Sequence, residues 1–394
     1  MLPQLFLKKN EERRLLAGHL WVFSNEIDNK QSPLKNFSAG QHVNVCRQDG
    51  RILGSAYVNP HSLISARIYS ARANQILDQV FIQEKLQAAL DLRESLYPTA
   101  FYRLCHSEGD FLPGLVVDRF GDYFSVQLNT FAMDGLRDEV IEALQSIVAC
   151  KGIVLRNDSS LRELEGLPLT SEVVFGDIPE TIEMQLPGQL FNVDLLSGQK
   201  TGWFYDQAEN RRLMQAYVKS RSVLDVFSYS GSWTVAALAA GATQVTAVDR
   251  SAAALTTLEQ NIALNAYSDQ VSCIQSDAMQ AIRQLKQEQA QYDVVIVDPP
   301  AFIKRKKDHK KGLGAYYDLN HSAMQLVKPG GIFISASCSF HLSASELQRS
   351  LLKAAQRLQR PLQILHQGQA GPDHPVHPAI AETNYLKAYF CRLL

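Results

Sequence analysis

The sequence lacks the features that identify several common classes of protein. Its six cysteines are widely scattered, with no C-x-x-C pair and no cysteine–histidine cluster at ligand spacing, so neither a zinc site nor a disulfide framework is indicated. No stretch approaches the roughly 20 apolar residues that a membrane-spanning helix needs. The apolar run at the N-terminus is also too short for a signal peptide. We therefore expect a cytoplasmic protein with no metal and no membrane partner.

A strong charge of either sign is also missing. The formal net charge of the 394-residue chain is −1, so its bulk charge does not indicate a polyanionic partner, and any surface for nucleic acid must be local. The hydrophobic content of 46% is ordinary for a globular protein, and the length predicts two or three domains. The function must therefore be inferred from local motifs.

The order of the expected elements divides the chain into three parts. Residues 1–72 contain short strand-like runs and an Asp49-Gly50 hairpin signal, which predict a small β-barrel domain. Residues 73–187 mix strands with helices and predict a central α+β domain. Residues 188–394 alternate strands and helices, which predicts an α/β domain with a doubly wound, mostly parallel sheet.

Acidic or sulfur-containing side chains follow five of the strands expected in the C-terminal domain. In such sheets ligands bind at the carboxyl ends of the strands, which meet at one edge. Packing explains any one such residue more easily than it explains all five together. The five residues are Asp225, Asp249, Asp277, Asp298 and Cys338.

The pattern over residues 223–249 predicts a strand, a tight turn, a helix and a second strand. A dinucleotide site would need G-x-G-x-x-G at the turn to bring the backbone against a pyrophosphate. Only Gly231 is present, and Phe227 and Tyr229 stand where the other glycines usually lie. Such a turn, with an acid at the first strand end, suits a ligand that has no phosphates and a cationic amino-acid end. S-adenosylmethionine (SAM) is such a ligand; the alternative is a βαβ unit that binds nothing.

The residues expected to bind SAM lie on this unit and on neighbouring segments. Asp249 suits the two ribose hydroxyls. Asp277 suits the adenine amino group, although a helix N-cap explains it equally well. The segment from Tyr205 to Arg211 is expected to close over the amino-acid end. The complete set is Tyr205, Gln207, Arg211, Asp225, Phe227, Ser228, Tyr229, Gly231, Asp249, Asp277 and Asp298.

The turn Asp298-Pro299-Pro300 ends an apolar strand. Its two prolines have no N–H and a fixed φ, so they stop the strand and hold the aspartate in one place. A carboxylate beside the methyl donor can bind a base edge or move a proton, which makes Asp298 a candidate catalytic residue. The alternative is an ordinary turn that terminates the strand.

Cys338 also ends an apolar strand, in the segment Ser337-Cys338-Ser339. A lone cysteine is usually a small buried apolar residue. Beside a methyl donor, however, a thiolate that adds to C6 of cytosine makes C5 nucleophilic enough to attack the methyl group. Methylation of nitrogen or oxygen needs no such thiol, so Cys338 is the candidate nucleophile that distinguishes the reaction types.

A dense basic segment follows the Asp298 turn. Its length and charge predict a loop at the edge of the site that contacts RNA phosphates, although most charge runs are only solvated surface. A target base inside a helix would have to be flipped out or presented in a loop. The basic residues are Lys304, Arg305, Lys306, Lys307, Lys310 and Lys311.

Six segments together carry a specific resemblance to a known family. They are Leu15–Phe23, Glu108–Arg119, Lys200–Gln207, the turn after Asp225, Asp298–Phe302 and Ser337–Ser339. Over nearly its whole length the chain is similar to the bacterial 23S ribosomal RNA 5-methylcytosine methyltransferase I family. The resemblance implies an RNA-binding PUA domain, a central α+β domain and a Rossmann-like class I methyltransferase domain that binds SAM. It also implies that Cys338 is the nucleophile and that the protein often forms a homodimer.

One position departs from related RNA cytosine methyltransferases that use two cysteines. Those enzymes carry Pro-Cys after the strand of Asp298, whereas this chain has Pro299-Pro300. The chain is therefore expected to use one cysteine, which leaves the group that assists product release unassigned.

The expected function is SAM-dependent formation of 5-methylcytosine in large-subunit ribosomal RNA. One alternative is methylation of a base nitrogen in ribosomal RNA, for instance guanine N7. The other is a non-catalytic protein that binds RNA during ribosome assembly and retains a relic SAM fold. The presence of Asp225, Asp249, Asp298 and Cys338 together argues against the relic.

Overall fold

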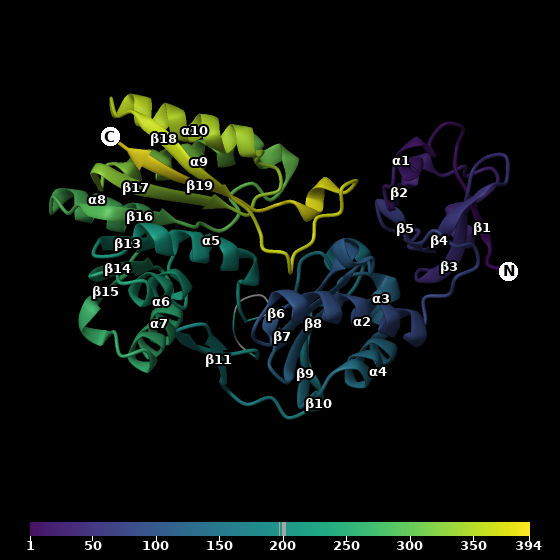
Figure 1. Ribbon diagram of the computed structural model, residues 1–394. Helices are drawn as coiled ribbons and strands as arrows, with labels where there is room; N and C mark the ends of the chain where they lie inside the picture. The colour runs from purple at the N-terminus through teal and green to yellow at the C-terminus, as the bar shows by residue number, and fades with distance from the viewer. Residues whose placement is uncertain (197, 199–201) are drawn as a thin grey trace. The chain divides into compact units, whose positions relative to one another are not determined.

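The computed structural model describes residues 1–196, 198 and 202–394, which form two compact units (Figure 1). The first unit comprises Met1–Met184, Val193–Tyr205 and Pro372–Thr383, and the second comprises Gln185–Asn192, Asp206–Gly371 and Asn384–Leu394. The domain boundaries near residues 72 and 187 remain a prediction. Lys200 and Thr201, which open the motif Lys200–Gln207, lie outside the described residues.

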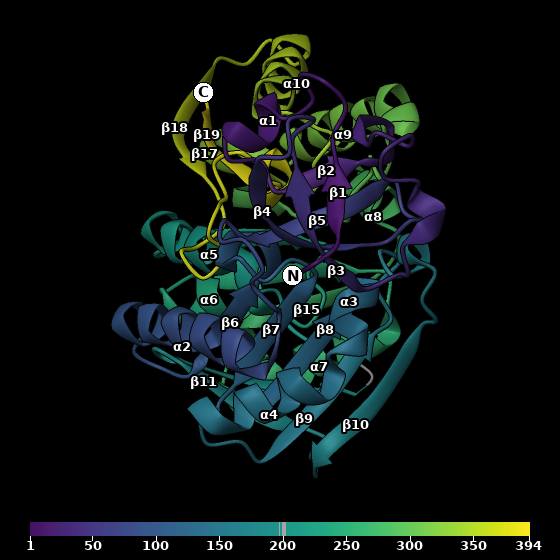
Figure 2. The same ribbon diagram turned by 90° about the vertical axis from the view of Figure 1, so that its right-hand side faces the viewer.

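The N-terminal part of the first unit is a five-stranded sheet (Figure 2). Gly50 takes a φ of +87° in the hairpin between β3 and β4, as the Asp49-Gly50 signal predicts. A bridge between Leu7 and Ile27 joins the two edges of the sheet, so the strands close into a small barrel. The elements are β1 (Gln4–Phe6), α1 (Arg13–Leu16), β2 (Trp21–Phe23), β3 (Gln41–Cys46), β4 (Ile52–Val58) and β5 (Ile64–Ser70), with sheet order β1-β3-β4-β5-β2.

The rest of the first unit packs helices against a second five-stranded sheet. Asp78 and Thr130 cap the helices α2 and α3 by accepting backbone N–H hydrogen bonds. The helical run after Thr130 is interrupted at Leu136, where ψ is +25°, so α3 and α4 are separate helices. The elements are α2 (Gln79–Leu96), β6 (Phe101–His106), β7 (Leu115–Phe120), β8 (Tyr123–Leu128), α3 (Phe131–Gly135), α4 (Arg137–Ile147), β9 (Gly152–Asn157) and β10 (Thr170–Gly176), with sheet order β10-β9-β8-β7-β6.

The second unit is built on a seven-stranded sheet in the order β15-β14-β13-β16-β17-β19-β18. The strands from β15 to β17 in this order pair in parallel, and β19 pairs antiparallel with both β17 and β18, which confirms a mostly parallel sheet. The strands are β13 (Ser222–Val226), β14 (Gln244–Asp249), β15 (Val271–Gln275), β16 (Tyr292–Val297), β17 (Val327–Ser337), β18 (Leu362–Gly368) and β19 (Lys387–Leu393). A separate pair is formed by β11 (Ile182–Leu186) and β12 (Gln189–Val193).

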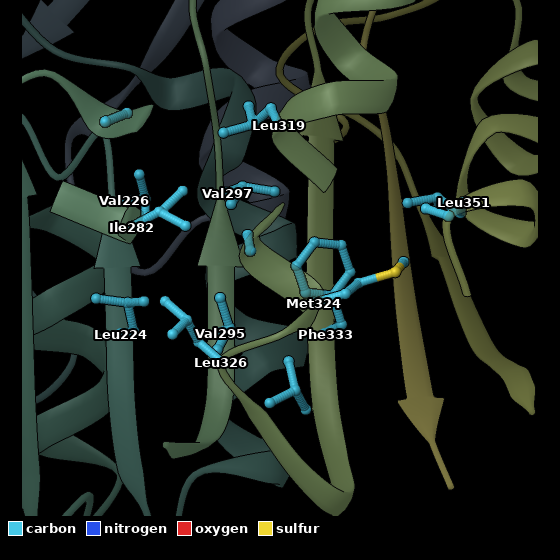
Figure 3. Packing of buried hydrophobic residues seen from close by; sticks show 14 of the residues in the cluster. Leu224, Val226, Ile282, Val295, Val297, Leu319, Met324, Leu326, Phe333 and Leu351 are labelled. Atoms are coloured by element: carbon cyan, nitrogen blue, oxygen red, sulfur yellow. The ribbon is translucent and has the colours of Figure 1, made fainter. Parts of the chain in front are cut away.

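Helices cover both faces of this sheet. Alternate residues of a strand point to opposite faces, so Leu224 and Val226 pack with α8, α9 and α10, whereas Val223 packs with α5 and α6. Figure 3 shows the first of these cores, in which Met324 of α9 and Leu351 of α10 contribute side chains. The helices are α5 (Ala208–Met214), α6 (Ser232–Ala239), α7 (Ala252–Leu264), α8 (Ala278–Gln287), α9 (His309–Met324) and α10 (Ala344–Arg357).

None of the helices in the described part of the chain has the length and apolar character needed to cross a membrane.

Replacing Leu351 by alanine tests the core beneath α10. Its side chain is fully buried, so Leu351→Ala should lower the free energy of unfolding by about 2–5 kcal/mol through lost burial and the cavity left behind. Leu352 is the matched control, because it is the next residue of the same helix and 46% exposed. Leu352→Ala should change the free energy by less than about 0.5 kcal/mol. Urea denaturation followed by circular dichroism measures both, and equal effects would contradict the burial pattern.

Candidate functional site

The turn between β13 and α6 has an unusual backbone. Phe227, Tyr229 and Gly231 all have positive φ values, of 69°, 48° and 85°. A Cβ added at Gly231 would lie 2.8 Å from Cγ of Leu258, so only glycine fits there. The turn therefore has a left-handed backbone at two positions that are not glycine, a phenylalanine and a tyrosine.

Asp249 at the end of β14 holds this turn in place. Its Oδ2 accepts a hydrogen bond from the backbone N–H of Tyr229 at 3.0 Å, and its Oδ1 accepts one from the N–H of Ser251 at 2.8 Å. Ser251 in turn caps α7 through the N–H of Ala254. The second acid of the βαβ unit thus connects the turn with the start of the next helix.

Asp225, in β13, has a strongly perturbed carboxyl group. Its side chain is fully buried, its Oδ2 accepts a hydrogen bond from Oγ1 of Thr234 at 2.7 Å, and its Oδ1 has no hydrogen-bond partner among the described residues. Burial raises the pKa of Asp225 to about 7. The negative charges of Asp298 and Asp249 also raise this pKa, whereas the hydrogen bond from Thr234 lowers it. A cation bound here would offset both the cost of burying the carboxylate and its repulsion by the two neighbouring acids.

Two hydroxyl groups of the turn are further hydrogen-bonding groups for a polar ligand. The Oγ atoms of Ser228 and Ser230 are buried and have no partner within the described part of the chain. Buried polar atoms in proteins are almost always hydrogen-bonded. Together with Oδ1 of Asp225 they form a set of unused acceptors and donors, which fits a ligand with a cationic amino-acid end such as SAM.

Asp298, directly after β16, is fixed from two sides. Its Oδ1 accepts a hydrogen bond from Nε2 of Gln207 at 2.9 Å, and its Oδ2 accepts one from Nε1 of Trp233 at 3.1 Å. Nδ2 of Asn210 donates to Oε1 of Gln207 at 2.7 Å, which sets the orientation of that amide. The sequence did not suggest Trp233, because it lies in an apolar helix and its indole N–H gives no separate signal.

Three other expected SAM-binding residues have different environments. Asp277 is exposed and caps α8 by accepting hydrogen bonds from the N–H groups of Met279 and Gln280, which supports the capping explanation. Arg211 lies in α5 and is buried. Tyr205 belongs to the first unit, where its hydroxyl donates to the carbonyl oxygen of Arg119 at 2.7 Å. The roles of these residues in cofactor binding remain predictions.

Cys338 follows β17 directly and is half-buried. Its two neighbours are fixed by one tyrosine of α9. Oγ of Ser337 donates to the hydroxyl of Tyr316 at 2.9 Å, and that hydroxyl is 2.8 Å from Oγ of Ser339. Oγ of Ser339 also accepts a hydrogen bond from the N–H of Ile303 at 3.2 Å, so the segment after Asp298 and the segment around Cys338 are joined.

The basic segment corrects one expectation, because it is not a loop throughout. Residues 306–308 form a 3-10 turn, and α9 begins at His309, so Lys310 and Lys311 are helical. The apolar pattern that starts at Gly312 explains the helix, since Gly312 and Tyr316 are buried one turn apart. The charges alone concealed this periodicity. All six basic residues are exposed, and their contact with RNA remains a prediction.

Within the described residues, no group of three or more His, Cys, Asp and Glu side chains could hold a metal ion.

The fold and the site define a class of protein, and the comparisons agree with it. Residues 156–388 match the family of S-adenosylmethionine-dependent methyltransferases, and residues 5–71 match the PUA-like domain family. The protein is therefore a SAM-dependent methyltransferase with a PUA-like domain, and SAM is its cofactor. A solved methyltransferase crystallised with S-adenosylhomocysteine has the same fold, with a TM-score of 0.86 and 21% identity over 99% of this chain and 100% of that chain.

Relatives identify the family more closely. A protein of Erwinia tasmaniensis named ribosomal RNA large subunit methyltransferase I is 36% identical over 405 residues, covering 100% of both chains. A protein of Klebsiella pneumoniae with the same name is 33% identical over 402 residues, covering 100% of this chain and 99% of the relative. The chain belongs to the ribosomal RNA large subunit methyltransferase I family.

The raised pKa of Asp225 predicts a pH dependence of stability in the cofactor-free protein. The folded state holds a proton up to about pH 7, whereas the unfolded state loses it near the ordinary pKa of about 4, so the free energy of unfolding should fall as pH rises between these values. Asp225→Asn removes this term. As the pH rises to about 7, the free energy of unfolding of the parent protein should therefore fall relative to that of the variant by on the order of 1 kcal/mol per pH unit.

Urea denaturation at pH 5, 6, 7 and 8 without SAM measures this difference. Asp269→Asn changes an exposed aspartate and serves as the control, which should follow the parent protein. Parallel pH profiles for the parent protein and Asp225→Asn would contradict the assignment.

Proposed function

We propose that the protein transfers a methyl group from SAM to C5 of a cytosine in large-subunit ribosomal RNA. The single observation that carries this proposal is the thiol of Cys338 at the carboxyl edge of the sheet, joined through Ser339 to the segment that follows Asp298. The ribosomal RNA substrate is supported by relatives named ribosomal RNA large subunit methyltransferase I that match the whole chain.

The proposed chemistry requires a nucleophile because C5 of cytosine is a weak carbon nucleophile. The thiolate of Cys338 forms a bond from Sγ to C6, and the electron pair of the C5–C6 double bond moves into the ring. C5 would then carry enough electron density to form a bond to the methyl group, while the sulfur–methyl bond of the donor would break and leave its electron pair on the sulfur. A base removes the C5 proton, its electron pair restores the C5–C6 double bond, and the Sγ–C6 bond breaks to return the thiolate.

The remaining residues bind and orient the reactants. Bound SAM supplies a methyl group on a positively charged sulfur. Asp225 and the turn at Phe227 to Gly231 would hold the cofactor, and the buried carboxylate would counter its positive charge. Asp298 keeps a fixed orientation between Gln207 and Trp233, and it accepts a hydrogen bond from the exocyclic amino group of the cytosine or moves a proton.

RNA contacts come from surfaces outside this centre. The exposed basic residues of 304–311 contact phosphates, and the PUA-like domain adds a second RNA surface. The target base enters the site unstacked. Ribosomal RNA as substrate implies a cytoplasmic location. The family resemblance also predicts a homodimer, which analytical ultracentrifugation of the full chain tests directly.

Cys338→Ala tests the covalent mechanism. Removal of the thiol should reduce methylation of ribosomal RNA by at least about a thousandfold, and the affinity for SAM measured by calorimetry should change less than about twofold, because the cofactor is held by other residues. Cys273→Ala is the matched control, since this cysteine is also half-buried but lies on the edge strand β15, and it should retain activity.

The product must be identified in the same experiment. Mass spectrometry of nucleosides from the methylated RNA should show 5-methylcytidine. Full methylation by Cys338→Ala would refute the covalent mechanism. A methylated guanosine would instead favour transfer to a base nitrogen.

The basic segment makes a separate prediction about salt dependence. The double substitution Lys306→Ala and Lys307→Ala should weaken RNA binding and reduce the slope of log affinity against log salt by about one to two, because each lysine neutralises one phosphate. Arg283→Ala with Lys286→Ala, on the exposed face of α8, is the control and should change the slope less. Filter binding at several salt concentrations measures both. An unchanged slope in the first variant would exclude this segment from the RNA surface.

A further inference from the structure

A buried lysine lies beside the proposed nucleophile. Lys387 opens β19, and its Cα pairs with that of Ser337 across the antiparallel ladder between β17 and β19. The side chain is only 6% exposed. Its Nζ donates to the carbonyl oxygen of Ser339 at 2.6 Å and to that of Leu342 at 2.5 Å. The ammonium group therefore holds the turn that follows Cys338.

The electrostatics of this lysine connect it with the thiol. Burial lowers the pKa of Lys387 to about 8, and negative charge on Cys338 and on Glu346 acts in the opposite direction. The positive charge of Lys387 and a negative charge on Cys338 therefore stabilise each other. A buried ammonium without such a partner would be unfavourable.

The other ionisable groups nearby come from α9 and α10. Burial raises the pKa of Tyr316, and negative charge on Cys338 adds to this effect, so the tyrosine stays neutral and donates or accepts only hydrogen bonds. Glu346 on α10 lies 2.9 Å from Nε2 of His309 and accepts hydrogen bonds from Ser343. Its charge is thus shared with groups at the surface, and Lys387 supplies the buried positive charge.

We propose that Lys387 is a positioning residue that fixes the turn carrying Cys338 and favours the thiolate form of that cysteine. The inference rests on the proposed function, in which Cys338 is the nucleophile. A thiolate, and not a thiol, adds to C6. A cation at fixed distance in a partly dry site favours the ionised thiol more than the same charge in water does. Sequence reasoning passed over Lys387 because a lysine within an apolar strand gives no indication of what it faces.

Alkylation of Cys338 by iodoacetamide tests this proposal without RNA. The rate is followed from pH 6 to pH 9 by mass spectrometry of the peptides, with Cys150 and Cys273 as internal references. Lys387→Gln keeps an N–H donor for the two carbonyl oxygens and removes the charge. It should move the midpoint of the profile to higher pH and lower the rate at pH 7 about tenfold, which corresponds to a shift of about one pH unit. Lys387→Arg keeps the charge and should stay within about threefold of the parent.

Lys328→Met is the matched control. Lys328 lies near the start of β17, whereas Cys338 follows the end of that strand. Nζ of Lys328 is 2.9 Å from Oδ2 of Asp293. Loss of this charge should leave the alkylation profile of Cys338 unchanged. An unchanged profile in a folded Lys387→Gln protein would overturn the proposal, as would an equal shift in Lys328→Met.

A reciprocal measurement covers the case in which Lys387→Gln does not fold. If the two groups are coupled, Cys338→Ser should lower the pH at which Lys387 titrates, as followed by ¹³C NMR of lysine Cε. An unchanged titration would contradict the proposal. These results are independent of methylation. Retained methylation by Cys338→Ala would overturn the proposed function, whereas uncoupled Lys387 and Cys338 would overturn this inference and leave the proposed function standing.

Discussion

The parallel pairing of the central strands is the constraint on which the site depends. β13 pairs in register with both β14 and β16, and β16 pairs with β17, so the residues that end these strands emerge at one edge. Asp225 lies opposite Ile296, and Val297 lies opposite Ser335. An acid of β13, the acid that follows β16 and the thiol that follows β17 therefore reach one edge of the sheet. A shift of one residue in this pairing would turn each side chain to the opposite face.

The same pairing gathers negative charge in a way that packing alone does not favour. Asp225 is raised in pKa by burial and by two neighbouring acids, and one of its oxygens has no partner among the described residues. A fold selected only for stability would replace such a group by an apolar or amide side chain. Its presence supports the proposal that positive charge binds beside it. In contrast, Asp298 has both oxygens engaged, which suits a group that must keep one orientation.

The sequence predicts much of the fold and only the outline of the site. Apolar alternation and turn signals are local, so the mostly parallel sheet and the roles of Asp225, Asp249 and Gly231 as ends and turns of a βαβ unit followed from them. Contacts between distant segments did not, because no local pattern records that Trp233 faces Asp298 or that Lys387 faces the turn after Cys338. The basic segment failed for another reason: its charges obscured the helical period of the buried residues that begin at Gly312.

The turn proposed to bind the cofactor has a defined shape without a ligand. Phe227 and Tyr229 adopt left-handed backbone conformations that glycine would adopt without strain. Phe227 packs against the core, and Asp249 holds the N–H of Tyr229. The entropy of ordering this loop is therefore lost during folding and not during binding. Glycine at either position would make the turn more flexible in the protein without ligand. If this turn holds the cofactor, ordering it would then reduce the affinity even with every contact retained.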